Sequence, residues 1–189
     1  MKVFLIRSDH RCYSLLPKDP AFFDKVGLFD GQPIEGIWSR LDDQERAFQV
    51  REPDTTRAGG FHDLVLGCLV YGDAVRMSKV GGILGKSGEV LPGTIEGYGP
   101  VFVLNPLASY PCFDLERSNY RKAGTAVVQV FEHVFLPDEI GDASVFKAQV
   151  RKRTSIYTVS DRGDPENDFY HQYQEACLSG LIFEEVWRS

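Results

Sequence analysis

Residues 127–135 constrain the fold more than any other segment of this 189-residue chain. Read as a strand, the segment carries apolar side chains on both faces: Val128, Val130 and Val134 on one, and Val127, Phe131 and Phe135 on the other. A strand that is apolar on both faces has to be covered on both. The pattern therefore predicts a strand in the middle of a sheet.

Shorter apolar segments predict strands along the rest of the chain. They are residues 3–6, 47–51 (an edge strand), 64–71, 101–104, 110–115, 155–159 and a final strand from residue 181. The segments between them predict only short helices, and no sustained alternation of strand and helix appears. The sequence therefore predicts an α+β fold with a mostly antiparallel or mixed sheet.

Three helices are predicted from their starting signals. Asp19-Pro20 and Asp164-Pro165 each combine a capping aspartate with proline at the first helical position, and Ser78 can cap a third helix. We expect the first helix to bury Phe22, Phe23 and Val26, and the last to carry the apolar stripe Phe169, Tyr173 and Cys177. Gly180 is predicted to end that helix. The C-terminal part of the chain is therefore predicted to run strand, helix, strand.

The length fits a single α+β domain over residues 1–189. Residues 27–46 contain three glycines, a proline and many charges, and are read mainly as loop. Residues 52–60 are the clearest linker-like segment, and a subdomain seam, if present, falls there. It would separate an N-terminal part, 1–51, from a C-terminal part, 61–189.

The formal net charge is −6, from 27 acidic and 21 basic side chains. This balance disfavours a general nucleic-acid-binding protein, which would show a basic excess. It permits attraction to a basic partner. The small basic patch of Lys147 and residues 151–153 is too short to indicate a nucleic-acid surface.

The four cysteines are scattered, with no pair at the spacing of a zinc or redox motif, and read as small, buried, reduced thiols. The apolar run at the N-terminus is too short for a secretory signal, and no segment reaches the length of a membrane span. We therefore expect a cytoplasmic protein that does not associate with membranes. The sequence leaves homo-oligomerisation open.

Residues 81–87 end in Gly85-Lys86-Ser87, as a phosphate-binding loop does. The pattern needs a glycine at position 80, which is Val80, and a helix beginning after the serine. Residues 88–93 include Pro92 and begin no long helix. The segment is therefore interpreted as the end of a helix followed by a turn, and no cofactor is predicted.

No catalytic or metal-binding residues are predicted. None of the four histidines is paired with another at the spacing that places two metal ligands on one helix face. Cys112 with His133 could form a nucleophile and its base, with Glu132 nearby. A buried thiol beside Pro111 and Phe113 is the favoured interpretation.

Two acidic clusters are the candidate partner-binding residues. They are Asp42, Asp43 and Glu45 in the first cluster and Asp161, Asp164, Glu166 and Asp168 in the second. Solvated loops and helix caps account for such clusters in most proteins. In the functional interpretation they form an acidic rim that speeds the encounter with a basic partner.

Several short motifs follow one another along the sequence from residue 62 onward. They are His62-Asp63-Leu64, Ser78 with Ile83-Leu84, Val103-Leu104-Asn105-Pro106-Leu107, Phe113-Asp114-Leu115-Glu116-Arg117-Ser118, Val145-Phe146, Ile156-Tyr157-Thr158-Val159-Ser160, and Leu178-Ser179-Gly180-Leu181-Ile182-Phe183 with Trp187. This order resembles an immunity-protein family of bacterial polymorphic toxin systems, the eleventh such family, formerly a domain of unknown function. The resemblance carries no catalytic residues.

The resemblance implies a protein that binds a cognate toxin of the same cell and neutralises it by occlusion, without catalysis. Such inhibition needs an interface of standard size with a few aromatic or charged anchors. The negative net charge would suit a basic toxin. The alternatives are an enzyme with an unrecognised active site, which would show a deep pocket lined by converging polar groups, and a small regulatory or adaptor protein.

Overall fold

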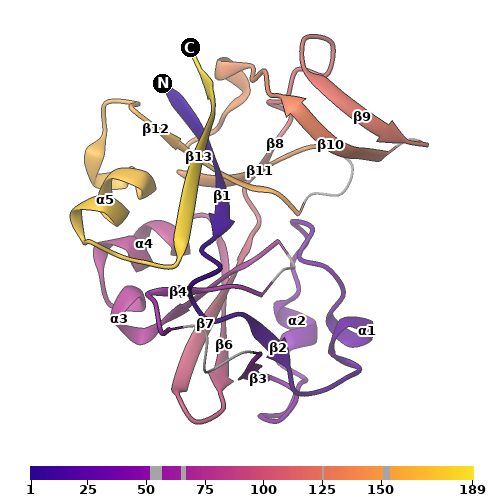
Figure 1. Ribbon diagram of the computed structural model, residues 1–189, viewed down its shortest axis with the longest axis vertical. Helices are drawn as coiled ribbons and strands as arrows, with labels where there is room; N and C mark the ends of the chain where they lie inside the picture. Colours follow the sequence, from indigo (N-terminus) through magenta and orange to yellow (C-terminus); the bar gives the residue numbers. More distant parts are fainter. Residues whose placement is uncertain (52–56, 65–66, 125, 151–153) are drawn as a thin grey trace.

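The computed structural model describes residues 1–51, 57–64, 67–124, 126–150 and 154–189. Two sheets lie one above the other, a two-stranded hairpin projects from the upper one, and short helices flank both (Figure 1). The predicted α+β class, with mixed sheets, short helices and a strand after the last helix, is confirmed.

The lower sheet has six strands in the order β2-β3-β6-β7-β5-β4. Their bounds are β2 Leu15–Pro17, β3 Ala47–Val50, β6 Gly88–Ile95, β7 Gly99–Pro106, β5 Leu69–Gly72 and β4 Phe61–His62. Only the β3–β6 pair is parallel; the other neighbours are antiparallel. The predicted strand at residues 47–51 is therefore confirmed, but its edge position is wrong, because β2 lies outside β3.

The upper sheet has five strands in the order β13-β1-β12-β11-β8. Their bounds are β13 Leu181–Arg188, β1 Lys2–Ser8, β12 Ile156–Ser160, β11 Val145–Ala148 and β8 Ser109–Tyr110. The first and last strands of the chain pair along their lengths, from Lys2 opposite Arg188 to Ser8 opposite Leu181. The two termini therefore lie side by side at the top of the molecule (Figure 1).

The remaining elements are short. They are the helices α1 Phe22–Val26, α2 Glu35–Trp38, α3 Asp73–Arg76, α4 Lys79–Gly85 and α5 Phe169–Glu175, the 3₁₀ turns η1 Pro137–Glu139 and η2 Pro165–Asn167, and the hairpin strands β9 Asn119–Ala123 and β10 Ala126–Glu132. Helix α2 lies within the segment predicted as loop. The last helix begins at Phe169 rather than at Pro165, because Asp164-Pro165 starts the 3₁₀ turn η2.

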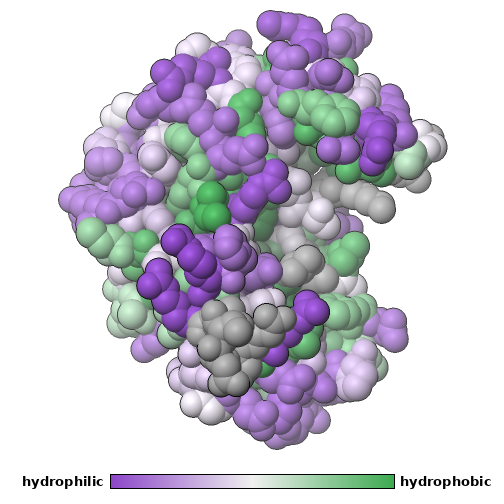
Figure 2. Space-filling model, viewed as in Figure 1, coloured by the Kyte–Doolittle hydropathy of each residue, from purple (hydrophilic) through white to green (hydrophobic). Residues whose placement is uncertain are grey.

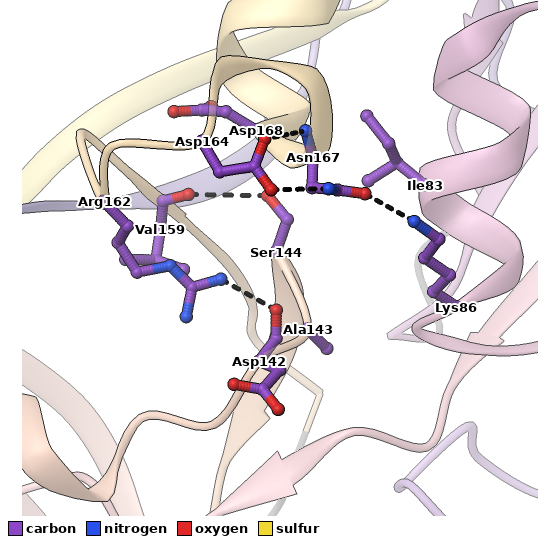
Figure 3. Close-up of a pocket in the computed structure, with 10 residues that line it drawn as sticks. All are labelled: Ile83, Lys86, Asp142, Ala143, Ser144, Val159, Arg162, Asp164, Asn167 and Asp168. Carbon is purple, nitrogen blue, oxygen red and sulfur yellow. Dashed lines mark hydrogen bonds between the residues drawn. The ribbon is translucent and has the colours of Figure 1, made fainter.

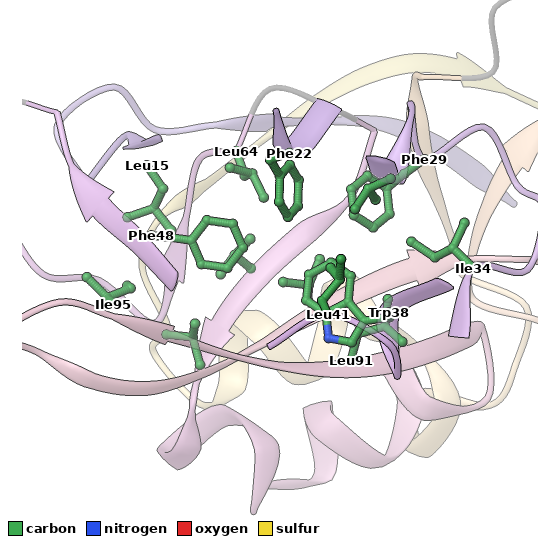
Figure 4. Packing of buried hydrophobic residues seen from close by; sticks show 14 residues of the cluster. Leu15, Phe22, Phe29, Ile34, Trp38, Leu41, Phe48, Leu64, Leu91 and Ile95 are labelled. Atoms are coloured by element: carbon green, nitrogen blue, oxygen red, sulfur yellow. The ribbon is translucent and has the colours of Figure 1, made fainter. Parts of the chain in front are cut away.

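One hydrophobic cluster fills the space between the lower sheet and helices α1 and α2 (Figure 4). The rings of Phe22 and Phe29 pack against Trp38, whose indole N–H donates to the Pro92 carbonyl at 2.8 Å. Trp38 anchors a helix of only four residues, too short to be stable without tertiary packing. Phe23, predicted to be buried on α1, is instead exposed.

A second cluster joins the two sheets through helices α4 and α5. It contains Ile6, Val145 and Ile156 from the upper sheet, Leu69, Tyr71 and Leu104 from the lower sheet, and Leu84, Phe169 and Tyr173 from the helices. The apolar contacts thus run continuously between the N-terminal and C-terminal parts of the chain. Residues 52–56 of the predicted seam lie outside the described residues, and the domain assignment stays a prediction.

The prediction that residues 127–135 form a central strand is wrong. Strand β10 covers Ala126–Glu132 and pairs, among the described residues, only with β9 in the projecting hairpin. The register between the two strands shifts twice, so that Val128 and Phe131 have no residue opposite them. Such bulges change the side-chain period, and the half-buried positions of β10 become Val127 and Val130, three residues apart.

The cysteines and the basic patch also differ from expectation. All four thiols are free, as predicted, but only Cys12 and Cys112 are buried, whereas Cys177 is exposed beyond the end of α5. Lys147 is not a surface cation: its side chain is fully buried, and its ammonium donates to the Phe29 carbonyl. Residues 151–153 of the predicted patch lie outside the described residues.

Candidate functional site

A cleft of about 580 Å³ opens between α4, the start of β11 and the segment that connects β12 to α5 (Figure 3). Its lining residues are Ile83, Lys86, Asp142, Ala143, Ser144, Val159, Arg162, Asp164, Asn167 and Asp168. Two of the predicted partner-binding residues, Asp164 and Asp168, therefore line a concave surface. Its volume is in the range of small-molecule pockets.

The polar groups of this cleft mainly bind one another. The Arg162 guanidinium donates to the carbonyls of Gly141 at 2.6 Å and Asp142 at 2.8 Å. The Lys86 ammonium donates to the Asn167 side-chain oxygen, and the Asn167 amide donates to Asp164 Oδ2 at 2.6 Å. These bonds hold the walls of the cleft together. The groups do not converge on one point, as groups that act on a bound substrate would.

The second acidic cluster has specific structural partners. Asp161 pairs with Lys2 at 2.7 Å, and this hydrogen bond lowers the pKa of the carboxyl group. Glu166 pairs with Lys79 at 2.8 Å on the surface. Asp164 accepts from the Asn167 backbone N–H and caps η2, and its hydrogen bonds to Asn167 lower its pKa.

Asp168 is the one member of this cluster whose side chain is buried. It accepts three hydrogen bonds: from Ser160 Oγ at 2.6 Å, from the Asp161 N–H at 3.1 Å and from the His171 N–H at 2.9 Å. The carboxylate thereby joins the end of β12 to the first turn of α5, so it faces the protein rather than a partner.

Asp168→Ala is therefore expected to lower the free energy of unfolding by about 2 kcal/mol, because it removes a helix cap and leaves buried donors unpaired. Urea denaturation monitored by circular dichroism measures this change. Asp142→Ala, in the same cleft but with an exposed carboxylate, is the matched control and should stay within about 0.5 kcal/mol of the wild type. An equal effect of both substitutions would contradict this assignment.

The first acidic cluster lies between α2 and β3, on the lower sheet. Asp42 accepts from the backbone N–H groups of Gln44 and Glu45, while Glu45 accepts from the Asp42 N–H, which makes a reciprocal cap. Glu45 also pairs with Lys25 of α1, and this pairing lowers the pKa of Glu45. Asp43, the most exposed of the three, pairs with Arg46 at 3.0 Å.

The structure does not bring the two acidic clusters together. One lies beside α1 and α2 at the lower sheet, and the other lies beside α5 at the upper sheet (Figure 1). They therefore do not form one continuous acidic rim. Their role in binding a partner stays a prediction for each cluster separately.

Helix α4 ends at Gly85, and Lys86 and Ser87 form a turn, as predicted; the strand β6, which was not predicted, begins directly after it at Gly88. The backbone N–H groups of Lys86 and Ser87 donate to the carbonyls of Ile83 and Leu84. They point back into their own helix, so they are not available for a phosphate group.

Cys112 and His133, which the sequence offered as a nucleophile and its base, do not have the properties of such a pair. Cys112 is fully buried, and burial raises the pKa of its thiol to about 12, so the reactive thiolate does not form at neutral pH. His133 packs between the rings of Phe113, Phe135 and Tyr157, and burial lowers its pKa.

No group of three or more His, Cys, Asp or Glu side chains in the described part of the chain is placed to hold a metal ion. The helices in the described ranges are all too short or too polar to cross a membrane.

The projecting β9–β10 hairpin is a feature that the sequence patterns did not predict. Phe131 is 58% exposed and Val128 42% exposed, although both are large apolar residues. Both occupy the bulge positions of β10. Green, apolar surface lies over this hairpin at the upper right of Figure 2, as one of several apolar patches on this face.

A signal for this hairpin was present in the sequence. Gly124, with a φ of 59°, lies between the polar segment Asn119–Ala123 and the apolar segment that follows, and glycine with positive φ is typical of tight hairpin turns. A central strand that is apolar on both faces has apolar neighbours on both sides, and the mostly polar strand at the other side of this turn does not provide one. The apolar run alone suggested the opposite.

A scan against models of known protein families finds no family that matches this chain, and a search of curated proteins finds no significant match. The resemblance to the immunity proteins therefore rests on the sequence motifs alone.

Proposed function

We propose that this protein acts by binding another protein, and that the partner is a toxin of a bacterial polymorphic toxin system. It neutralises the toxin in the cytoplasm by covering the active site or locking the conformation, without catalysis. The motifs from residue 62 onward support the toxin as partner. The β9–β10 hairpin supports binding through a surface.

The observation that carries this proposal is the exposure of Phe131 and Val128. Each Å² of apolar surface left in water forgoes about 25 cal/mol, so apolar side chains held in solvent by two bulges are unfavourable for the isolated fold. Bulges commonly re-aim side chains at functional sites. Exposed aromatic residues are frequent anchors of protein interfaces, where a few residues provide most of the binding energy.

The arrangement of the polar groups supports occlusion rather than chemistry. In the cleft beside α5, Arg162, Lys86 and Asn167 are engaged in bonds that hold the fold together. The Cys112 thiol is buried and protonated. A folded surface that covers a toxin needs neither a nucleophile nor a base.

The net charge of −6 would suit a basic toxin as the partner. A basic toxin would be attracted over a distance comparable to the Debye length, about 8 Å at physiological salt. The association rate should therefore fall as salt is added, whereas the dissociation rate should change little.

Coexpression with the product of the neighbouring reading frame tests the proposal. We expect that frame to be toxic alone and harmless in the presence of this protein. The double variant Val128→Asp/Phe131→Asp should lose protection and weaken binding by about 100-fold, as expected when an interface anchor is removed. Isothermal titration calorimetry with the purified toxin measures the affinity.

Phe23→Asp provides the matched control, because Phe23 is 45% exposed on α1, away from the hairpin. It should retain protection and affinity. Circular dichroism should show an unchanged melting temperature for the hairpin variant, since its two side chains already lie in solvent. Unrelieved toxicity with the wild-type protein would refute the toxin assignment, and full affinity of the hairpin variant would refute the assigned surface.

A further inference from the structure

A groove of about 650 Å³ lies between the hairpin and the upper sheet. One wall consists of seven consecutive residues, from Val127 to His133. The other wall is formed by side chains of β1, β12 and β13. A regular strand places only every second side chain on one face, but two bulges interrupt this alternation in β10, and all seven residues line the groove along the strand edge that lies away from β9.

That edge of β10 has no strand partner in the described part of the chain, because β10 pairs only with β9 there. Within the described ranges, no hydrogen bond from outside the hairpin reaches the backbone of residues 127–132. An unpaired strand edge is a template for an extended segment of another chain. A strand of seven residues offers about 20 Å of such edge.

The floor of the groove is apolar. Leu5 and Tyr157 are buried there, and Val130 and Val186 are half-buried against the same cluster. The exposed ring of Phe131 also lines the groove. An occupant therefore gains by placing an apolar side chain toward the floor.

The rim is acidic. Among the described residues, Glu132, Glu184 and Glu185 line the groove together with one cation, Arg7. Arg7 pairs with Glu184 at 2.7 Å, and Arg188 pairs with Glu185 at 2.9 Å. No described residue forms an ion pair with Glu132, whose side chain is exposed. His133 is kept neutral by burial, which lowers its pKa, so it adds no positive charge.

We infer that this groove holds an extended segment of the protein partner that carries an apolar side chain flanked by lysine or arginine. The segment pairs with the free edge of β10, its apolar side chain lies against Tyr157 and Phe131, and its cations meet Glu132 and Glu185. Phosphate-bearing partners are disfavoured by the three carboxylates. This inference rests on the proposed function and adds the place and the chemistry of recognition.

Hydrogen–deuterium exchange on the complex with the purified toxin tests the backbone part. The amides of residues 127–133 should exchange more slowly in the complex than in the free protein. The free protein should show no such protection at increasing concentration, because protection without the toxin would identify a second copy of this chain as the occupant and overturn the inference.

Charge reversal tests the rim. Glu132→Lys should weaken toxin binding at least about 10-fold, mainly through a slower association rate, and should reduce the salt dependence of that rate. Asp24→Lys makes an equal charge change on the exposed face of α1. It should leave the affinity within about 2-fold of the wild-type value, since an exposed charge far from the interface contributes little. Glu132→Gln should give an intermediate affinity.

The outcomes separate the two proposals. If the wild-type protein does not bind the toxin, the proposed function fails and this inference fails with it. If the wild type binds but the β10 amides stay unprotected, or Glu132→Lys binds as Asp24→Lys does, only the groove assignment is overturned. Binding of an unrelated acidic protein by the Glu132→Lys variant alone would support an electrostatic role for this rim.

Discussion

Trp38→Ala is expected to lower the free energy of unfolding by about 3–5 kcal/mol, the range for truncating a large buried aromatic side chain. Trp38 lies in the hydrophobic cluster between the lower sheet and helices α1 and α2 (Figure 4). Its ring centroid lies 5.9 Å from that of Phe22 and 6.4 Å from that of Phe29. The substitution leaves a cavity among these rings and also removes the donor to the Pro92 carbonyl. A loss of this size is a large part of the stability of an ordinary domain.

Urea denaturation measures the loss, with the midpoint lowered and the slope unchanged. Ile37→Ala, at the exposed neighbouring position of the same short helix, is the control and should change the unfolding free energy by about 0.5 kcal/mol at most. Trp38→Phe should fall between the two, because it keeps an aromatic ring but loses the indole donor. If the unfolding free energy of Trp38→Ala stayed within about 1 kcal/mol of the wild-type value, Trp38 would not anchor α2 to this cluster.

Much of the fold could be predicted because the signals are local. Strands β1, β12 and β13 are apolar segments that end at charged or turn residues, and α5 carries Phe169 and Tyr173 on one face. Gly180, with a φ of 104°, makes the turn before β13, although α5 itself ends at Glu175, earlier than predicted. Each signal depends only on neighbours along the sequence.

Strand β6 could not be predicted, because its sequence contains Gly88, Pro92 and Gly93. Proline is tolerated there because β3 pairs with β6 only at Thr94 and Ile95, so Pro92 has no neighbouring strand on its nitrogen side. Gly88 is required because a Cβ would lie 2.0 Å from the Asn105 carbonyl oxygen. These reasons appear only once the strands are placed side by side.

The prediction of a central strand at residues 127–135 is wrong for a related reason. An apolar segment on both faces fits a buried strand, and although Gly124 signals a hairpin turn, the segment itself does not show that two bulges present Val128 and Phe131 to solvent. The acidic clusters show the same limit. Asp161 and Glu166 find Lys2 and Lys79, far away in the sequence, so their structural partners could not be read from the charge pattern.

Acidification from pH 7 to pH 4 is expected to reduce the stability of the fold through His62. This side chain is buried in β4 against the Tyr13 ring, with centroids 5.7 Å apart, and no described atom hydrogen-bonds to its Nδ1. Burial lowers the pKa of His62 from 6.5 to about 4. The unfolded chain therefore takes up a proton below pH 6.5, whereas the folded protein resists it until about pH 4.

The sign follows from this difference in proton uptake. The unfolded state binds more protons between these two pH values, so the free energy of unfolding rises with pH across this window. Each unit of difference between the folded and unfolded pKa of His62 is worth about 1.36 kcal/mol. Acidification to pH 4 should therefore lower the free energy of unfolding by about 3 kcal/mol. Above pH 6.5 His62 contributes no pH dependence.

His62→Phe isolates this contribution, because it keeps an aromatic ring beside Tyr13 and cannot titrate. Urea denaturation at pH 7, 6, 5 and 4 should give a curve of stability against pH that is flatter than that of the wild type by about 3 kcal/mol over the window. His171→Gln, which changes an exposed histidine of α5, should keep the wild-type curve. Parallel curves for His62→Phe and the wild type would show that His62 is solvated, and that β4 opens in the native state.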